Sequence, residues 1–155
     1  MKTRSQDYSK IVFEQISALE LPKDKQKIYG SLCHTFPLMV MRSGLSQSVA
    51  FVLVKAKLQD RLEDRHKESM PHKVFLENLA SLSGLLLDEG RVPRKFQEKT
   101  HELELFEYMR ITRKILAASI WYKRFAESLL GVEAGEDTGN EVDGDNTEEG
   151  EANDN

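Results

Sequence analysis

Apolar residues recur every three or four positions along most of this 155-residue chain, and this spacing restricts the possible folds more than any other feature. Such an interval places side chains on one face of an α-helix, whereas a half-buried strand needs alternation with a period of two. The first stretch of this kind contains Tyr8, Ile11, Val12, Ile16 and Leu19. No stretch alternates as a strand would, so the sequence predicts an all-α protein.

Residues that favour helix ends divide the first half of the chain into three predicted helices. Ser5 is a suitable N-cap for the first helix, and Pro22 follows its end. Pro37 is expected to kink or divide the second helix, because proline lacks the amide donor that a helix needs. Gly44 can adopt the left-handed cap conformation and separates the second helix from the third. The residues expected to face the core in these two helices are Tyr29, Leu32, Cys33, Phe36, Val40, Leu45, Val49, Val52, Leu53 and Ala56.

The second half of the chain is predicted to add two further helices. Pro71 suits the first turn of a fourth helix, which is expected to end near Gly90. A Val-Pro pair then links to a last and longest helix over residues 96–130, which Gly131 terminates. The core-facing residues predicted for the fourth helix are Phe75, Leu79, Leu82 and Leu86. About five helices joined by short connections predict a compact bundle.

Charge divides the chain into a basic body and an acidic tail. All 22 Lys and Arg residues precede Gly131, where 16 acids accompany them, so the body carries a net charge of +6. Residues 132–155 contain the other ten acids, no base and almost no apolar side chain. Such a segment cannot offset its ordering entropy by burial. We therefore expect a helical domain over residues 1–131 and a disordered acidic tail over residues 132–155.

The residue types that enzymes use do not occur in productive arrangements. No Gly-rich phosphate loop is present, and Cys33, the only cysteine, can form neither an internal disulfide nor a four-thiolate metal site. His101 and Glu104 lack the further ligands that a metal on a helix requires, and Glu104 and Glu107 lie among compensating charges. The sequence predicts neither enzymatic activity nor a bound metal or cofactor.

Targeting signals are also missing from the sequence. The longest uninterrupted apolar run, residues 49–54, is far shorter than the roughly 20 residues that cross a bilayer. The N-terminal ten residues carry charge with no apolar block behind them, unlike a secretory signal peptide. We therefore expect a cytoplasmic protein without a membrane partner.

Two long segments, residues 25–59 and 108–126, contain several cations and no acid. Several cations along one line can contact successive phosphates of a nucleic acid. At 100° per residue, one helix face of the second segment forms a basic stripe of Arg110, Arg113, Lys114, Ala117, Trp121 and Arg124. The candidate RNA-binding residues in the two segments are Arg42, Lys55, Lys57, Arg110, Arg113, Lys114, Lys123 and Arg124.

An ordinary solvated helix surface would also produce the basic stripe, because helices of soluble proteins carry Lys and Arg outward. Trp121 is expected to pack in the core rather than to stack on a base. The residue pattern alone therefore leaves nucleic-acid binding and a solvated face both open.

Two segments contain recognisable motifs in a fixed order. Residues 28–57 combine a Tyr-led helix, a proline and an Arg-x-Gly-Leu-x-Gln sequence ahead of an Ala-Phe pair. Residues 109–130 contain Thr-Arg-x-x-Leu followed by Trp-x-Lys-Arg-Phe-Ala. Together these segments resemble the small helical subunit of the type III-B CRISPR effector complex, the Cmr complex. The acidic tail is no part of that family's pattern.

The resemblance implies a non-catalytic subunit that stacks along the backbone filament of a guide-RNA complex for antiviral defence. It implies that the protein helps to hold the duplex of guide RNA and target RNA. The implied partners are the backbone and large subunits, neighbouring copies of the same protein, and both RNA strands. Two other interpretations stay open: a helical adaptor that binds another protein without nucleic-acid contact, and a DNA-binding regulator.

Overall fold

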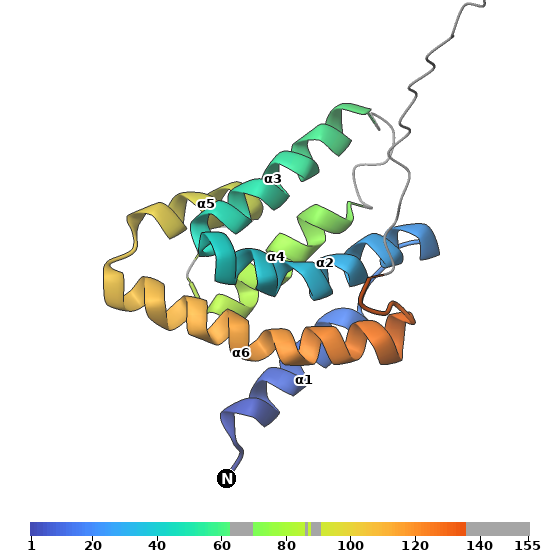
Figure 1. Cartoon of the computed structure of the whole chain (residues 1–155), viewed down its shortest axis with the longest axis horizontal. Helices are drawn as coiled ribbons and strands as arrows, with labels where there is room; N and C mark the ends of the chain where they lie inside the picture. The colour runs from blue at the N-terminus through green and yellow to red at the C-terminus, as the bar shows by residue number, and fades with distance from the viewer. Residues whose placement is uncertain (63–69, 86, 88–90, 136–155) are drawn as a thin grey trace, which may run out of the picture.

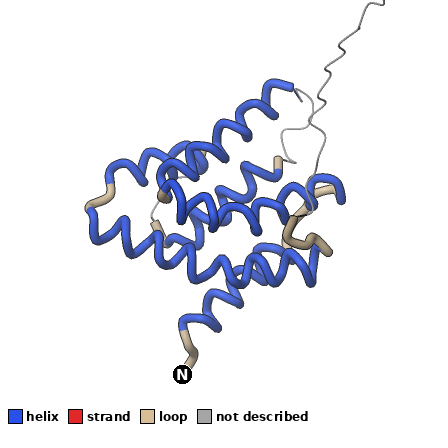
Figure 2. The backbone as a smooth tube through the Cα atoms, viewed as in Figure 1, coloured by secondary structure: helices blue, strands red, loops and turns tan. Residues whose placement is uncertain are grey.

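The computed structural model describes residues 1–62, 70–85, 87 and 91–135, and its secondary structure is entirely helical over these residues (Figures 1 and 2). Six helices follow one another along the chain: α1 Arg4–Ser17, α2 Lys23–Ser43, α3 Leu45–Leu62, α4 Pro71–Ser83, α5 Val92–Glu102 and α6 Leu105–Leu130. The predicted all-α bundle is confirmed, although the described residues form six helices where the sequence predicted about five.

Helix α1 begins earlier than the sequence analysis indicated. Its N-cap is Thr3, whose hydroxyl accepts a hydrogen bond from the Gln6 amide at 3.2 Å, while Gln6 Oε1 accepts one from the Thr3 amide at 2.8 Å. This reciprocal pair is a capping box, which satisfies two amide donors at the helix start. The prediction that Ser5 is the N-cap is wrong, and Ser5 lies inside the first turn.

Pro37 does not divide α2, which continues through it as a single helix from Lys23 to Ser43. The helix ends at Gly44, whose φ of +81° is a backbone conformation that favours glycine. The Tyr108 hydroxyl from α6 lies only 3.3 Å from the position that a side chain at Gly44 would take. Gly44 therefore permits both the tight connection to α3 and the close approach of α6.

The second half of the chain differs from the prediction at two helix ends. Helix α4 ends at Ser83 rather than near Gly90, because Gly84 takes the left-handed conformation with φ of +73°. Leu86, predicted to face the core, lies outside the described residues. The single long helix predicted over residues 96–130 is two helices, since Leu103 and Glu104 both have extended backbone. The Val-Pro pair predicted as a link forms the first turn of α5.

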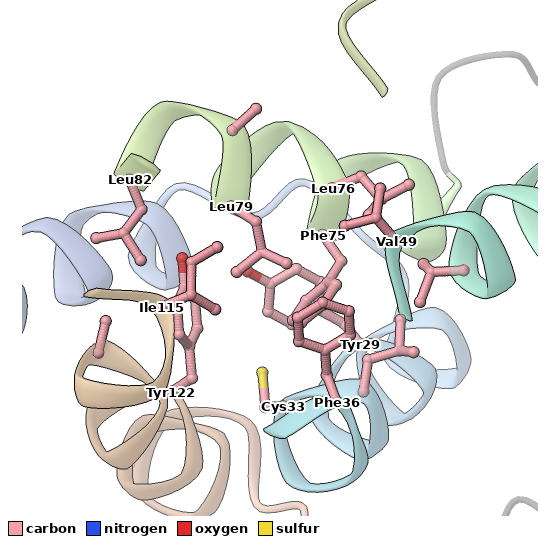
Figure 3. Close-up of a cluster of buried hydrophobic side chains, with 14 of the residues drawn as sticks. Tyr29, Cys33, Phe36, Val49, Phe75, Leu76, Leu79, Leu82, Ile115 and Tyr122 are labelled. Atoms are coloured by element: carbon pink, nitrogen blue, oxygen red, sulfur yellow. The ribbon is translucent and has the colours of Figure 1, made fainter. Parts of the chain in front are cut away.

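The core is centred on four aromatic rings contributed by α2, α4 and α6 (Figure 3). The Phe75 ring lies 5.6 Å from that of Tyr29, 5.2 Å from that of Phe36 and 6.1 Å from that of Tyr122, measured between centroids. All ten residues predicted to face the core in α2 and α3 are buried. Cys33 lies beneath these rings, and its burial raises the pKa of its thiol well above the ordinary value. This confirms its interpretation as a small buried apolar residue.

Helix α6 joins the two sides of the bundle. It runs antiparallel to α2 on one side and is crossed by α1 on another (Figure 1). Gln15 fixes α1 in place, because its amide donates to the Asn78 carbonyl of α4 at 3.0 Å and its carbonyl oxygen accepts from the Tyr122 hydroxyl of α6. The first and last helices of the chain are thus packed against each other.

The chain stays packed as far as Val132, two residues beyond the end of α6. Gly131 ends that helix with φ of +68°, and Val132 then returns to the surface of α2, where it is only 2% exposed. The Val132 carbonyl lies 2.8 Å from Nε2 of the buried His34, and the Val132 side chain occupies the space above Gly30. We name this contact the Val132 anchor. The predicted boundary after residue 131 therefore assigns one buried residue to the tail.

Deleting residues 132–155 is expected to lower the free energy of unfolding by about 2 kcal/mol, because the Val132 side chain leaves the core. The sequence analysis implied no loss, since it treated residues 132–155 as wholly unpacked. A matched truncation after Gly135 keeps Val132 and should unfold like the full chain. Denaturant titration measures both variants, and equal stability of the two truncations would contradict the anchor.

Candidate nucleic-acid interface

An open groove of about 960 Å³ lies between α1 and α6. Its walls combine cations, aromatic rings and aliphatic side chains from the two helices. The residues that line it are Arg4, Ser5, Asp7, Tyr8, Ile11, Phe106, Met109, Arg110, Arg113, Lys114, Ala117 and Ile120. The groove follows the N-terminal half of α6, where the sequence predicted the basic stripe.

Three of the predicted cations, Arg110, Arg113 and Lys114, line this groove. Helix α1 adds Arg4, which the sequence analysis missed because only the packing of α1 on α6 brings it there. Arg124 lies further along α6, with its guanidinium 5.4 Å from the centre of the Trp121 ring. The groove therefore contains three of the four cations of the stripe but not Arg124, and Lys123, a candidate outside the stripe, does not line the groove either.

The cations of the groove differ in how much of their charge is free to bind an anion. Arg110 donates two hydrogen bonds to the Glu107 carboxylate, at 2.9 and 2.5 Å. These bonds raise the pKa of the Arg110 guanidinium and lower the pKa of the Glu107 carboxyl. Arg113 and Lys114 take part in no ion pair with any described residue. A phosphate entering the groove would therefore meet less competition from a carboxylate at these two side chains than at Arg110.

Trp121 lies at the seam between α1 and α6 and is half-buried. Its indole nitrogen donates to the Ser5 hydroxyl at 3.1 Å, and its ring stacks on Phe125 at 5.7 Å with an interplanar angle of 26°. Trp121 thus packs against the core without entering it, so the predicted core position is only partly right. Trp121 is only half-buried because it shares a face of α6 with the exposed cations of the basic stripe.

Replacing Trp121 with alanine is expected to cost roughly 2 kcal/mol of stability. This is less than the 3–5 kcal/mol typical of a fully buried tryptophan, because part of the ring is already exposed. The matched variant Trp121→Phe keeps the stack on Phe125 and loses only the hydrogen bond to Ser5, for about 1 kcal/mol. Denaturant unfolding compares the two variants. A Trp121→Ala cost above about 3 kcal/mol would favour the core interpretation.

The other three predicted cations do not join the stripe. Arg42 lies in the last turn of α2, and Lys55 sits over the Phe51 ring with its ammonium 5.0 Å from the ring centre. Lys57 lines a separate hollow of about 470 Å³ between α3, α4 and α5. The further cations of that hollow, which the sequence analysis missed, are Lys73, Arg91 and Arg94. They went unnoticed because acids surround them in the sequence.

Much of the charge in this second hollow is already balanced. Lys73 pairs with Glu77 at 3.9 Å, and Arg94 pairs with Glu98 at 2.9 Å. Both are exposed pairs one helix turn apart, of a kind that contributes little to stability but does reduce the local positive field. The α1–α6 groove is therefore the better candidate for binding a polyanion.

His72 is a buried residue at the start of α4. Burial, followed by the positive charges of Lys55 and Lys25, lowers the pKa of His72 from 6.5 to about 4. The folded protein therefore keeps His72 neutral at pH values where the unfolded chain would protonate it. Between pH 6.5 and 4 the unfolded state binds more protons, so stability falls as the pH falls.

We expect the wild-type protein to lose roughly 2 kcal/mol of stability through His72 between about pH 7.5 and about pH 5. Most carboxylates remain ionised over this range, so their contribution is small. In the variant His72→Gln the pH dependence should be correspondingly flatter. Denaturant titrations at both pH values measure the difference, and parallel pH profiles for the two proteins would show that His72 titrates normally.

Two kinds of feature are absent from the described part of the chain. No cluster of three or more His, Cys, Asp or Glu side chains there could hold a metal ion. His101 and Glu104, which lie close in sequence, are separated by the break between α5 and α6. None of the helices described there has the length and apolar character that a bilayer crossing requires.

The fold and the site together define a class: a small helical bundle with a basic groove between its first and last helices. Residues 4–129 match the family described as CRISPR-associated protein (Cas_Cmr5). A relative from Thermus thermophilus, the CRISPR system Cmr subunit Cmr5, is 33% identical over 130 residues, which cover 84% of this chain and 98% of the relative. The chain therefore belongs to the Cmr5 family of CRISPR-associated proteins.

A solved structure supports the same assignment. It is the X-ray crystal structure of a CRISPR-associated Cmr5 family protein, also from Thermus thermophilus. The two structures agree with a TM-score of 0.56 at 33% sequence identity, over 83% of this chain and 98% of that chain. The resemblance drawn from residues 28–57 and 109–130 is thus confirmed, and the match ends close to the end of α6.

Proposed function

We propose that this chain is a non-catalytic small subunit of a type III-B Cmr effector complex, where it helps to hold the duplex of guide RNA and target RNA. Membership of the Cmr5 family supports the assignment to the complex. The observation that carries the RNA contact is the α1–α6 groove, in which Arg113 and Lys114 have no acidic partner among the described residues. We infer a cytoplasmic location from the same assignment.

In this proposal the groove binds the RNA backbone and does not read its sequence. Arg113 and Lys114 would contact successive phosphates, and Arg4 would add a third charge from the facing helix. Such contacts are electrostatic and weaken as salt is added, because binding releases the counterions of the RNA. Sequence choice would come from pairing between guide and target, as in other RNA-guided complexes.

Contacts with other subunits would use apolar side chains that the bundle leaves exposed. Residues of this kind outside the α1–α6 groove include Leu38, Met41, Phe51, Val54 and Leu105. Exposed apolar side chains of this kind mark surfaces that can be covered in an assembly. We propose backbone subunits, the large subunit and neighbouring copies of this chain as the partners, with no cleavage chemistry contributed by this subunit.

The test is purification of the tagged full chain from its native host. We expect guide RNA and the backbone subunits to co-purify, and we expect both to survive a moderate-salt wash. The same chain carrying Arg113→Glu and Lys114→Glu should retain protein partners held by apolar contacts while recovering less RNA. Recovery of protein partners with no RNA from either chain would instead favour the helical adaptor.

A further inference from the structure

Residues 136–155 contain nine acids and no base, and they begin four positions after Val132, the residue of the Val132 anchor. The family match ends at residue 129, so this acidic segment lies beyond the part of the chain that matches the family. Its charge opposes the +6 net charge of the body to which it is attached. A run of carboxylates presents the same sign of charge as an RNA backbone.

The acidic segment starts within reach of the groove. Val132 is held on the α2 side of α6, and the groove lies on the α1 side of the same helix. From Gly131 back to Arg113 is about 27 Å along the helix, at 1.5 Å per residue. Twenty residues beyond Gly135 can span at most about 65–70 Å. The segment can therefore pass Arg124 at the end of α6 and extend to Arg113 and Lys114.

Because the acidic segment is covalently attached to the body, even a weak contact between its carboxylates and the groove cations can be populated. A tethered segment faces its site at an effective concentration on the order of millimolar. Contacts between an acidic peptide and a few exposed cations are screened by salt beyond a Debye length of about 10 Å at 0.1 M. Such a contact competes with RNA most strongly at low ionic strength.

We infer that the acidic segment 136–155 occupies the α1–α6 groove when RNA is absent, through Arg113 and Lys114, and competes with RNA for them. This inference rests on the proposed function, because the competition matters only if RNA enters the groove. The Val132 anchor holds the chain against α2, just beyond the end of α6, and so fixes where the segment starts. The segment acts as an internal substitute for the RNA backbone and favours release of weakly bound RNA.

Three forms of the chain test the inference. They are the full chain, a truncation after Gly135 that keeps the Val132 anchor, and a full-length variant whose nine acids are changed to Asn or Gln. Fluorescence anisotropy with a labelled single-stranded RNA should show about tenfold tighter binding by the second and third forms at about 50 mM salt. The difference should shrink at about 300 mM salt. Equal affinities of all three forms at low salt would overturn the inference.

A second measurement follows the contact without RNA. Amide shifts of residues 110–117 should differ between the full chain and the truncation at low salt, and the difference should vanish in Arg113→Glu/Lys114→Glu. Unchanged shifts overturn the inference even if RNA binds well. Changed shifts in a chain that binds no RNA would leave the tail contact standing and reject the proposed function. A control reversal, Lys10→Glu/Lys99→Glu, changes net charge equally outside the groove and should leave the shift difference in place.

Discussion

The double reversal Arg113→Glu/Lys114→Glu is expected to reduce RNA affinity by at least about 100-fold at low salt, measured on the chain truncated after Gly135. Charge-assisted hydrogen bonds contribute about 1.5–3 kcal/mol each, and two of them are replaced by repulsion. The double alanine variant should lower the slope of log affinity against log salt by about 1.4–1.8 units. Anisotropy titrations at several salt concentrations measure both quantities, on single-stranded and duplex RNA.

Arg110 provides a matched comparison within the same groove. Its guanidinium already binds Glu107, so Arg110→Ala should weaken RNA binding less than about threefold. The reversal Lys10→Glu/Lys99→Glu keeps the same net charge as the double reversal and lies outside the groove. If this control loses as much affinity as the groove variant, overall charge and not the groove governs RNA binding.

Replacing Phe75 with alanine is expected to lower the free energy of unfolding by about 3–5 kcal/mol. Phe75 is 2% exposed and touches the rings of Tyr29, Phe36 and Tyr122, so its loss opens a cavity where α2, α4 and α6 meet. The comparison is Phe13→Ala, in which a half-exposed ring loses one edge contact with Phe125 for about 1 kcal/mol. Denaturant unfolding measures both variants. Equal losses of unfolding free energy would show that the aromatic cluster is not the core.

The helical fold could be predicted because the spacing of apolar residues reports which face of each helix is buried. The helix ends were harder to predict. At Leu103 and Glu104 the chain contains no proline or glycine, and only the extended backbone of these residues separates α5 from α6. At Thr3 the signal was present, because Thr-x-x-Gln is a capping box, but Ser5 offered a competing cap.

The candidate site was predictable along one helix and not between helices. Helical geometry placed Arg113 and Lys114 on one face, and the groove contains both. The pairing of Arg110 with Glu107 was also available, since residues three apart on a helix are neighbours. Arg4 could not be assigned, because its place in the groove depends on a contact between segments about a hundred residues apart in sequence.

The pairing of α1 with α6 also sets an order of events during synthesis. The first helix to leave the ribosome packs mainly on the last one, and Gln15 finds Tyr122 only after about a hundred further residues have been made. Until then α1 has only its smaller contact with α4, which includes the hydrogen bond from Gln15 to Asn78. The groove that we propose for RNA does not exist in a nascent chain that stops before α6, so such an incomplete translation product lacks it.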